Sequence, residues 1–246
     1  MKLFLCLLCS LSLVFSQFDK EYKEALRLEK AKEDAKAMII YDQILALDSN
    51  QVTALTHGAN VSTQLGVVSN DKNLKISYFY KAMDYATKAM KLNPNYDEAY
   101  ISHARAMGRL ALMSETKQQL AMSYEINKNV DKATEINPEN GIAWHILGKW
   151  YFKFADLSWF ERTMAGIIYG KVPKATFKES KAAFKKAMDI QPTFISHKLE
   201  YAKSCIELDE FIEAKSYLEE VLSAKIVLST DRVYKNEAKK LLADMD

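Results

Sequence analysis

The chain has 246 residues, of which 49% are hydrophobic and 27% are charged, so it can bury a large core and is not a disordered tail. Lysine and arginine total 34 against 32 acidic residues, and a net charge of +2 gives no overall field that favours nucleic acid, so any charged site must be local. Only 7 glycines and 4 prolines interrupt the chain, which predicts an all-helical protein.

The first 16 residues have the pattern of a targeting segment. Lys2 precedes an apolar run from Leu3 to Phe15, which is shorter than the roughly 20 residues that cross a bilayer as a helix. We predict a signal peptide over 1–16, cleaved ahead of Gln17, and an exported protein, secreted or periplasmic. The alternative is a chain anchored in a membrane through an uncleaved N-terminal segment. Cleavage would leave Cys205 as the one remaining cysteine, and its apolar helix face predicts a buried, unreactive thiol.

Residues 17–246 repeat one structural unit. An aliphatic residue followed by a short polar or proline-containing turn recurs at Ser49, Pro94, Pro138 and Pro192, and these turns are 45, 44 and 54 residues apart. Each interval exceeds the 34-residue period of a tetratricopeptide repeat, so we attribute the excess to inserted length. The pattern predicts a tetratricopeptide-like helical-repeat solenoid, an α-α superhelix of about five helix pairs with insertions.

The early repeats show how such pairs pack. We expect a first pair over about 19–47, a second pair from 51 with a polar break at 69–71, and a third pair from 100 with a break near 114. Small residues at helical spacing would let the paired helices touch. In the second repeat these are Ala82, Ala86 and Ala89.

The fourth repeat is the clearest and also the longest. Trp144, Leu147, Gly148 and Tyr151 form the pattern W-x2-L-G-x2-Y of a first repeat helix, in which the glycine lets the second helix approach closely. About twenty extra residues then precede the second helix. We interpret them as an inserted helix near 158–170.

Two capping boxes delimit this insertion. Ser158 with Glu161 three residues later predicts the start of the inserted helix, and Thr176 with Glu179 predicts the start of the delayed second helix. The fifth repeat is compact again. A last amphipathic helix over 231–245 is predicted to cap the apolar end of the solenoid.

Several sequence motifs of the fourth repeat are more specific than the general repeat pattern. They are His145-x-Leu147-Gly148-x-Trp150, Phe154-Ala155-x3-Trp159 and Pro173-x2-Thr176-x2-Glu179. The region from Gln51 to Leu242 resembles the regulator of microtubule dynamics family. The resemblance implies a helical tetratricopeptide-like domain that works as an adaptor, in a family whose eukaryotic members are linked to microtubules and to organelle membranes.

Motifs of catalysis are not found in the sequence. It contains no glycine-rich phosphate loop, no H-E-x-x-H, no Cys-x-x-Cys pair in the mature chain and no serine elbow, so we predict a non-enzymatic protein without a cofactor or metal. The four histidines fall on four different first helices, which stack about 10 Å apart, and the four cannot share one metal ion. They are His57, His103, His145 and His197.

The first helices of a tetratricopeptide solenoid line its concave face, and the position after the conserved small residue points into it. Here that position is Leu26 in the first repeat and is polar or basic in the later repeats. Arg109 lies one helical turn beyond Arg105 and shares its face. Cations at one-repeat spacing suit an extended acidic peptide, a C-terminal carboxylate or a lipid phosphate. A solvated helix face is the alternative. The candidate binding residues are Asn60, Arg105, Arg109, Lys149 and Lys203.

The aromatic residues around the insertion form a second candidate site. If they lie beside the cations, they would contact the acyl chain of an amphiphile, whereas burial within the repeat is the alternative. The candidates for apolar ligand contact are Trp150, Phe154, Trp159 and Phe160.

Together these patterns predict a non-enzymatic binding or scaffold protein that recognises an extended acidic or amphiphilic partner on its concave face. We expect a protein or peptide partner, with lipid as a further possibility and no nucleic acid. The alternatives are a lipid-binding or lipid-transfer domain, and a microtubule-associated adaptor as the resemblance implies. Repeat scaffolds present many different surfaces, so the fold alone does not select among them.

Overall fold

The computed structural model describes residues 18–169, 172 and 174–245, and these residues form helices and turns without any strand. The chain divides into two compact units, 1–94 and 95–246, which we describe separately. Among the described residues, no helix combines the length and the apolar character that crossing a membrane requires.

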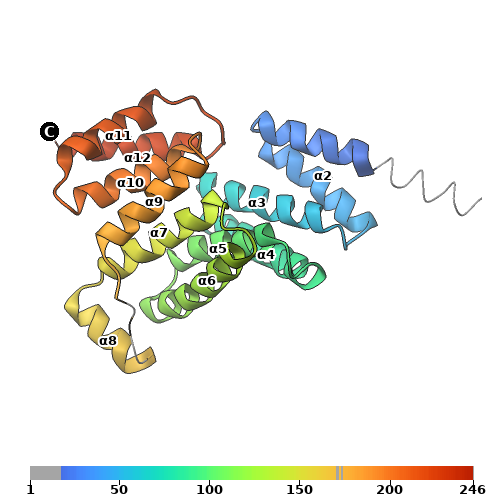
Figure 1. Cartoon of the computed structure of the whole chain (residues 1–246). Helices are drawn as coiled ribbons and strands as arrows, with labels where there is room; N and C mark the ends of the chain where they lie inside the picture. Colours follow the sequence, from blue (N-terminus) through green and yellow to red (C-terminus); the bar gives the residue numbers. More distant parts are fainter. Residues whose placement is uncertain (1–17, 170–171, 173, 246) are drawn as a thin grey trace, which may run out of the picture. The chain divides into compact units, whose positions relative to one another are not determined.

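The first unit contains a helix over 18–30 followed by α2 (Asp34–Leu47), α3 (Val52–Val68) and α4 (Lys72–Leu92) (Figure 1). Tyr41 of α2 is fully buried, and α3 packs against both α2 and α4. Along α4 the predicted small residues Ala82, Ala86 and Ala89 are all fully buried. Their small size allows the close approach of α3 and α4.

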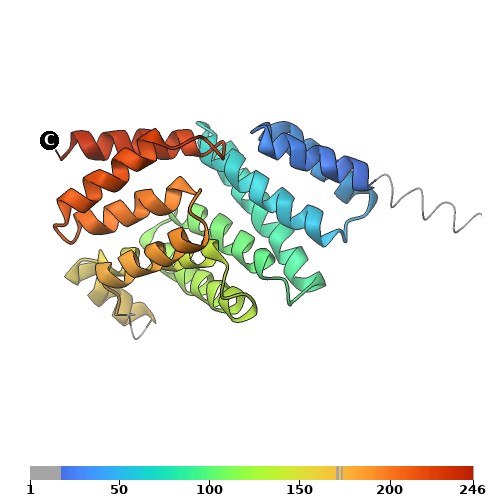
Figure 2. The same cartoon turned by 45° about the horizontal axis from the view of Figure 1, so that its top comes forward.

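The second unit contains eight helices among its described residues. Successive helices pair in order, α5 with α6, α7 with α9 and α10 with α11, while α12 packs on α10 and α11 (Figures 1 and 2). Their bounds are α5 (Asp97–Ala111), α6 (Thr116–Ile136), α7 (Gly141–Ala155), α8 (Trp159–Tyr169), α9 (Phe177–Ile190), α10 (Ile195–Ile206), α11 (Phe211–Ser223) and α12 (Asp231–Ala243).

Gly148 sets the distance between α7 and α9, as its place in the repeat pattern predicts. A Cβ atom added there would lie 2.7 Å from Cε1 of the fully buried Phe184 on α9. Ser180 of α9 donates a hydrogen bond from its hydroxyl to the Gly148 carbonyl at 2.9 Å, so the two backbones are held in close contact. The structure confirms the expected role of this glycine.

Both predicted capping boxes are present. The Thr176 hydroxyl accepts a hydrogen bond from the backbone N–H of Glu179, whose carboxylate accepts one from the backbone of Thr176, and α9 begins there. Ser158 and Glu161 make the same reciprocal contacts at the start of α8. Since α8 occupies 159–169, it lies in the predicted insertion and separates α7 from its partner α9.

Candidate partner-binding site

The candidate cations of the second unit lie on helices that open successive pairs. Arg105 and Arg109 are on α5, Lys149 is on α7 and Lys203 is on α10; α7 contacts α5 and α10, and α10 contacts α12. The fifth candidate, Asn60, lies on α3 of the first unit.

A buried carboxylate lies at the centre of these cations. Glu200 of α10 is only 6% exposed, and its Oε1 accepts a hydrogen bond from Nζ of Lys149 at 2.6 Å. Nζ of Lys203 lies 3.3 Å from Oε2 of the same carboxylate. Burial alone would raise the pKa of Glu200, but Lys149 and Lys203 hold it well below its usual value. The carboxylate is therefore ionised and held by two lysines.

The C-terminal helix α12 closes one side of this cluster. Lys203 donates to Oε1 of Glu237 at 2.9 Å, and Nη2 of Arg109 donates to the Tyr234 hydroxyl at 2.7 Å. Burial favours loss of the Lys203 proton, yet the carboxylates of Glu200 and Glu237 raise its pKa overall. Residues of α5, α10 and α12 are thus joined by charge-assisted hydrogen bonds, which are stronger than neutral ones.

Two of the four histidines are in direct contact beside these cations. Nδ1 of His145 on α7 lies 2.9 Å from Nδ1 of His197 on α10, so one ring donates and the other accepts. His197 is fully buried, and its Nε2 has no hydrogen-bond partner among the described residues. Burial lowers the pKa of His197 to about 4 with a contribution from Arg105, and burial with the neighbouring His197 also places the pKa of His145 well below its usual value. Both rings are therefore neutral at pH 7.

The sequence interpretation missed both the central carboxylate and the histidine pair. Glu200 precedes Lys203 by three residues, so helical spacing alone would have placed the two side chains on one face. His145 follows the turn residue Pro138 by seven residues and His197 follows Pro192 by five. The two offsets differ by two residues, which is about 200° around a helix, so spacing gave no signal that the two rings would meet.

The four candidate aromatic residues separate into an inner and an outer pair. Phe154 is buried with Leu120 and Ala165, and Trp150 packs on Phe154 at 4.5 Å between ring centroids while its Nε1 donates to the Ser123 carbonyl. Trp159 and Phe160 on α8 are instead 79% and 66% exposed. The first pair forms core and the second pair forms surface.

One further cluster has ligand atoms suited to a metal ion. The Sγ atom of Cys205 and carboxylate oxygens of Glu210 and Glu213 lie within 4.8 Å of one another. Nζ of Lys181, however, lies 2.5 Å from Glu210 and 2.7 Å from Glu213, so an ammonium group already neutralises these carboxylates. Cys205 is fully buried, as expected, and burial raises the pKa of its thiol to about 12.

Solved structures share the fold of this chain. A tetratricopeptide-repeat protein of Thermus thermophilus matches with a TM-score of 0.65 and 15% sequence identity, covering 92% of this chain and 99% of that protein. The predicted all-α tetratricopeptide-like class is therefore confirmed. At this identity the likeness concerns the fold alone.

Curated relatives share the same sequence pattern over much of the chain. Regulator of microtubule dynamics protein 1 of Mus musculus is 25% identical over 199 residues, which are 80% of this chain and 65% of that protein. Regulator of microtubule dynamics protein 3 of Rattus norvegicus is 23% identical over 184 residues, which are 74% of this chain and 39% of that protein. The chain thus spans less than two thirds of the length of either relative.

These relatives correct the predicted localisation. Their names tie them to microtubules, which are polymers of the interior of eukaryotic cells, and the relatives do not support secretion. The prediction of an exported protein, secreted or periplasmic, is therefore wrong. It rested on the apolar pattern of 1–16, a segment that lies outside the described residues.

The chain also matches a family as a whole. The family described as regulator of microtubule dynamics protein 1-3 matches residues 17–246, which include both units and the inserted helix. A tetratricopeptide-like fold and this family together are typical of scaffolds for protein interaction. The chain belongs to the regulator of microtubule dynamics protein 1-3 family.

Proposed function

We propose that the chain is a non-enzymatic scaffold whose second unit binds a carboxylate-rich segment of a partner protein at the cations of α5, α7 and α10. The observation that carries this proposal is the buried Glu200, which Lys149 and Lys203 already hold as an ionised carboxylate. The same donors, with the arginines beside them, can hold carboxylates of a partner by the same charge-assisted bonds.

The electrostatics of Arg105 support this proposal. The carboxylates of Glu200 and Glu237 pair with the lysines of the cluster, and Glu98 lies close enough to Arg105 to raise the pKa of that arginine. Burial acts in the opposite direction and lowers the Arg105 pKa overall, so this guanidinium is partly desolvated. A desolvated cation gains more from an incoming carboxylate than one in bulk water.

The relatives suggest where such a partner is found. Their names associate them with the regulation of microtubule dynamics, so proteins of the microtubule system are the partners to examine first. An acidic chain segment on such a protein would present the carboxylates that the cluster requires. A microtubule-associated adaptor is the specific form of the scaffold that we propose.

The probe for this site is a synthetic ten-residue glutamate peptide, with binding followed by fluorescence anisotropy. Replacing Arg105 and Lys149 together by glutamine removes two charges but keeps polar side chains. We expect this variant to weaken binding about 100-fold, since each lost charge-assisted bond contributes roughly 1.5 kcal/mol or more. Circular dichroism would verify that the variant remains folded.

The matched control replaces two lysines of exposed ion pairs, Lys132 on α6 and Lys185 on α9, by glutamine. The control lowers the net charge equally, so it should retain the affinity of the unmodified chain within about threefold, which is the small effect expected of exposed, screened charges. Equal loss in both variants would show that only net charge matters. Undiminished binding by the Arg105 and Lys149 variant would refute the proposed site.

A further inference from the structure

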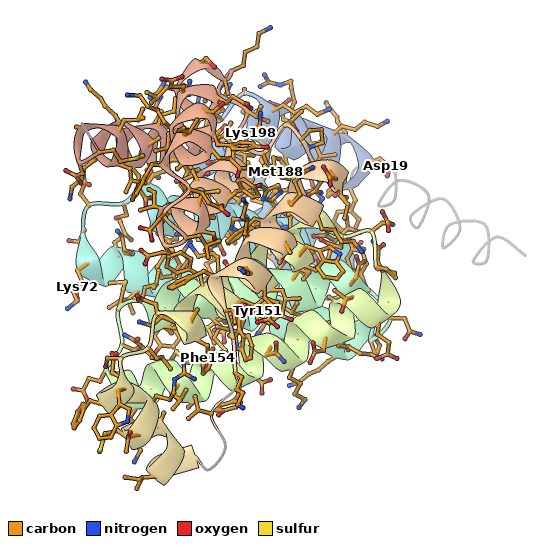
Figure 3. The ribbon with its side chains drawn as sticks, turned by 60° about the vertical axis from the view of Figure 1, so that its left-hand side comes forward. Asp19, Lys72, Tyr151, Phe154, Met188 and Lys198 are labelled. Carbon is orange, nitrogen blue, oxygen red and sulfur yellow. The ribbon has the colours of Figure 1, made fainter. Side chains whose placement is uncertain are left out.

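The inserted helix α8 is attached to the second unit along one side. Nη2 of Arg162 donates to the carbonyl of Phe154 at 2.6 Å, and Ala165 packs in the cluster of Phe154 and Leu120. The capping box of Ser158 fixes its start. In Figures 1 and 3 this helix lies at the edge of the unit, with Phe154 marking the end of α7 that it contacts.

The other side of α8 is apolar and exposed. Trp159, Phe160, Met164 and Ile167 are 79%, 66%, 41% and 74% exposed, an unusual concentration for an 11-residue helix. At about 100° per residue these four side chains, with Thr163 among them, occupy an arc of about 140° around the helix. We refer to these four residues as the α8 apolar arc.

The sequence that includes and flanks α8 is basic. The sequence 153–178 contains five cations and two carboxylates, and one of these carboxylates, Glu161, is held by the Ser158 hydroxyl at 2.7 Å. The α8 apolar arc itself includes no carboxylate. The five cations of this stretch are Lys153, Arg162, Lys171, Lys174 and Lys178.

We propose that α8 docks on the surface of an anionic lipid bilayer, with the α8 apolar arc inserted at the boundary between head groups and acyl chains. Tryptophan and phenylalanine favour that boundary, and nearby lysines gain from the negative surface potential. The helix is about 16 Å long against a hydrocarbon core of about 30 Å, so it lies in the surface and does not cross it. This site involves none of the cations Arg105, Arg109, Lys149 and Lys203, so the two proposals can fail separately.

Charge argues against a second copy of this chain as the occupant. A symmetric contact between two α8 apolar arcs would bring two identical basic segments together, and like charges at a contact oppose association. An anionic bilayer instead provides charge of the opposite sign. The arc is also convex, so a deformable lipid surface can bury it without a preformed groove.

The test is flotation of the full chain with two kinds of vesicle. One consists of phosphatidylcholine alone, and the other contains about 30% phosphatidylserine, which gives it an anionic surface. We expect binding to the anionic vesicles and a blue shift of tryptophan emission that the variant Trp159→Phe removes. Replacing both Trp159 and Phe160 by alanine should weaken vesicle binding by about tenfold or more, because binding scales with the apolar area inserted.

The matched control is Phe211→Ala with Ile212→Ala, since these neighbouring residues at the start of α11 are also exposed, at 50% and 90%. This control should bind vesicles as the unmodified chain does. Replacing Lys153 and Lys174 by glutamine should weaken binding to anionic vesicles roughly tenfold.

Three results would overturn the proposal. The first is failure of the unmodified chain to float with anionic vesicles. The second is equal binding by the folded alanine variant of Trp159 and Phe160. The third is a dimer that the same variant abolishes and that forms without vesicle binding, which would assign the α8 apolar arc to a second copy of the chain.

Discussion

Substitution of Gly148 by alanine tests the close contact between α7 and α9. The new Cβ would lie 2.7, 2.8 and 2.9 Å from three atoms of the Phe184 ring, about 1 Å closer than an ordinary contact between carbon atoms. Because Phe184 is fully buried, its ring cannot move into solvent. Overpacking of this kind costs about 1 to 3 kcal/mol, while alanine returns about 1 kcal/mol of helix propensity. We expect a net loss of up to about 2 kcal/mol in the free energy of unfolding.

Gly108 of α5 provides the matched control. A Cβ added there meets only Cδ1 of Ile126 at 3.8 Å, an ordinary contact, so Gly108→Ala should keep the gain of about 1 kcal/mol in helix propensity. The two variants should then differ by about 1 to 3 kcal/mol, which corresponds to roughly 2 to 12 °C in Tm for a chain of this size.

Thermal unfolding followed by far-ultraviolet circular dichroism would measure this difference. A Gly148→Ala, Phe184→Leu double variant replaces the phenyl ring by a smaller side chain. It should recover part of the lost stability, because the two substitutions act on the same contact. The reasoning is refuted if Gly148→Ala unfolds at the same temperature as Gly108→Ala or above it.

Three further outcomes follow from the structure. The unfolded chain binds a proton at His197 near pH 6.5 but the folded chain binds it only near pH 4, so the free energy of unfolding should fall by about 3 kcal/mol at most as the pH drops through that interval. Urea unfolding at about pH 7 and about pH 4.5 would measure this fall. A His197→Gln variant whose stability keeps the same dependence on pH would contradict the assignment to His197. The Cys205 thiol should react with a disulfide reagent only after denaturant is added, and fast labelling of the native chain would contradict its burial. Thr176→Ala should cost about 1 kcal/mol through loss of the capping box whereas Thr176→Ser should cost little, a contrast that thermal unfolding would detect.

Features that depend on near neighbours in the chain could be predicted from the sequence. The capping box at Thr176 joins residues three apart, and the role of Gly148 follows from its place in the repeat pattern. The inserted helix could be predicted in the same way, from its own start and stop signals. Such features are encoded within a few turns of helix, so residue spacing alone contains them.

The identity of the charged neighbours depended on packing between helices. Spacing placed cations on successive first helices, but it did not show that Lys149 would reach Glu200 across α7 and α10, or that His145 would meet His197. Contacts of this kind depend on how far one helix is shifted and rotated against the next. A shift of one residue turns a side chain by about 100°, which is enough to remove it from the contact.

The aromatic residues of the fourth repeat show the same division. Their sequence predicts an apolar helix, and all four candidates are equally suited to core or to surface. Only the packing of α8 through Ala165 buried Phe154 and left Trp159 and Phe160 exposed. Local spacing therefore specified which residues form helices, whereas the side on which each helix met its neighbours decided which residues remained available for binding.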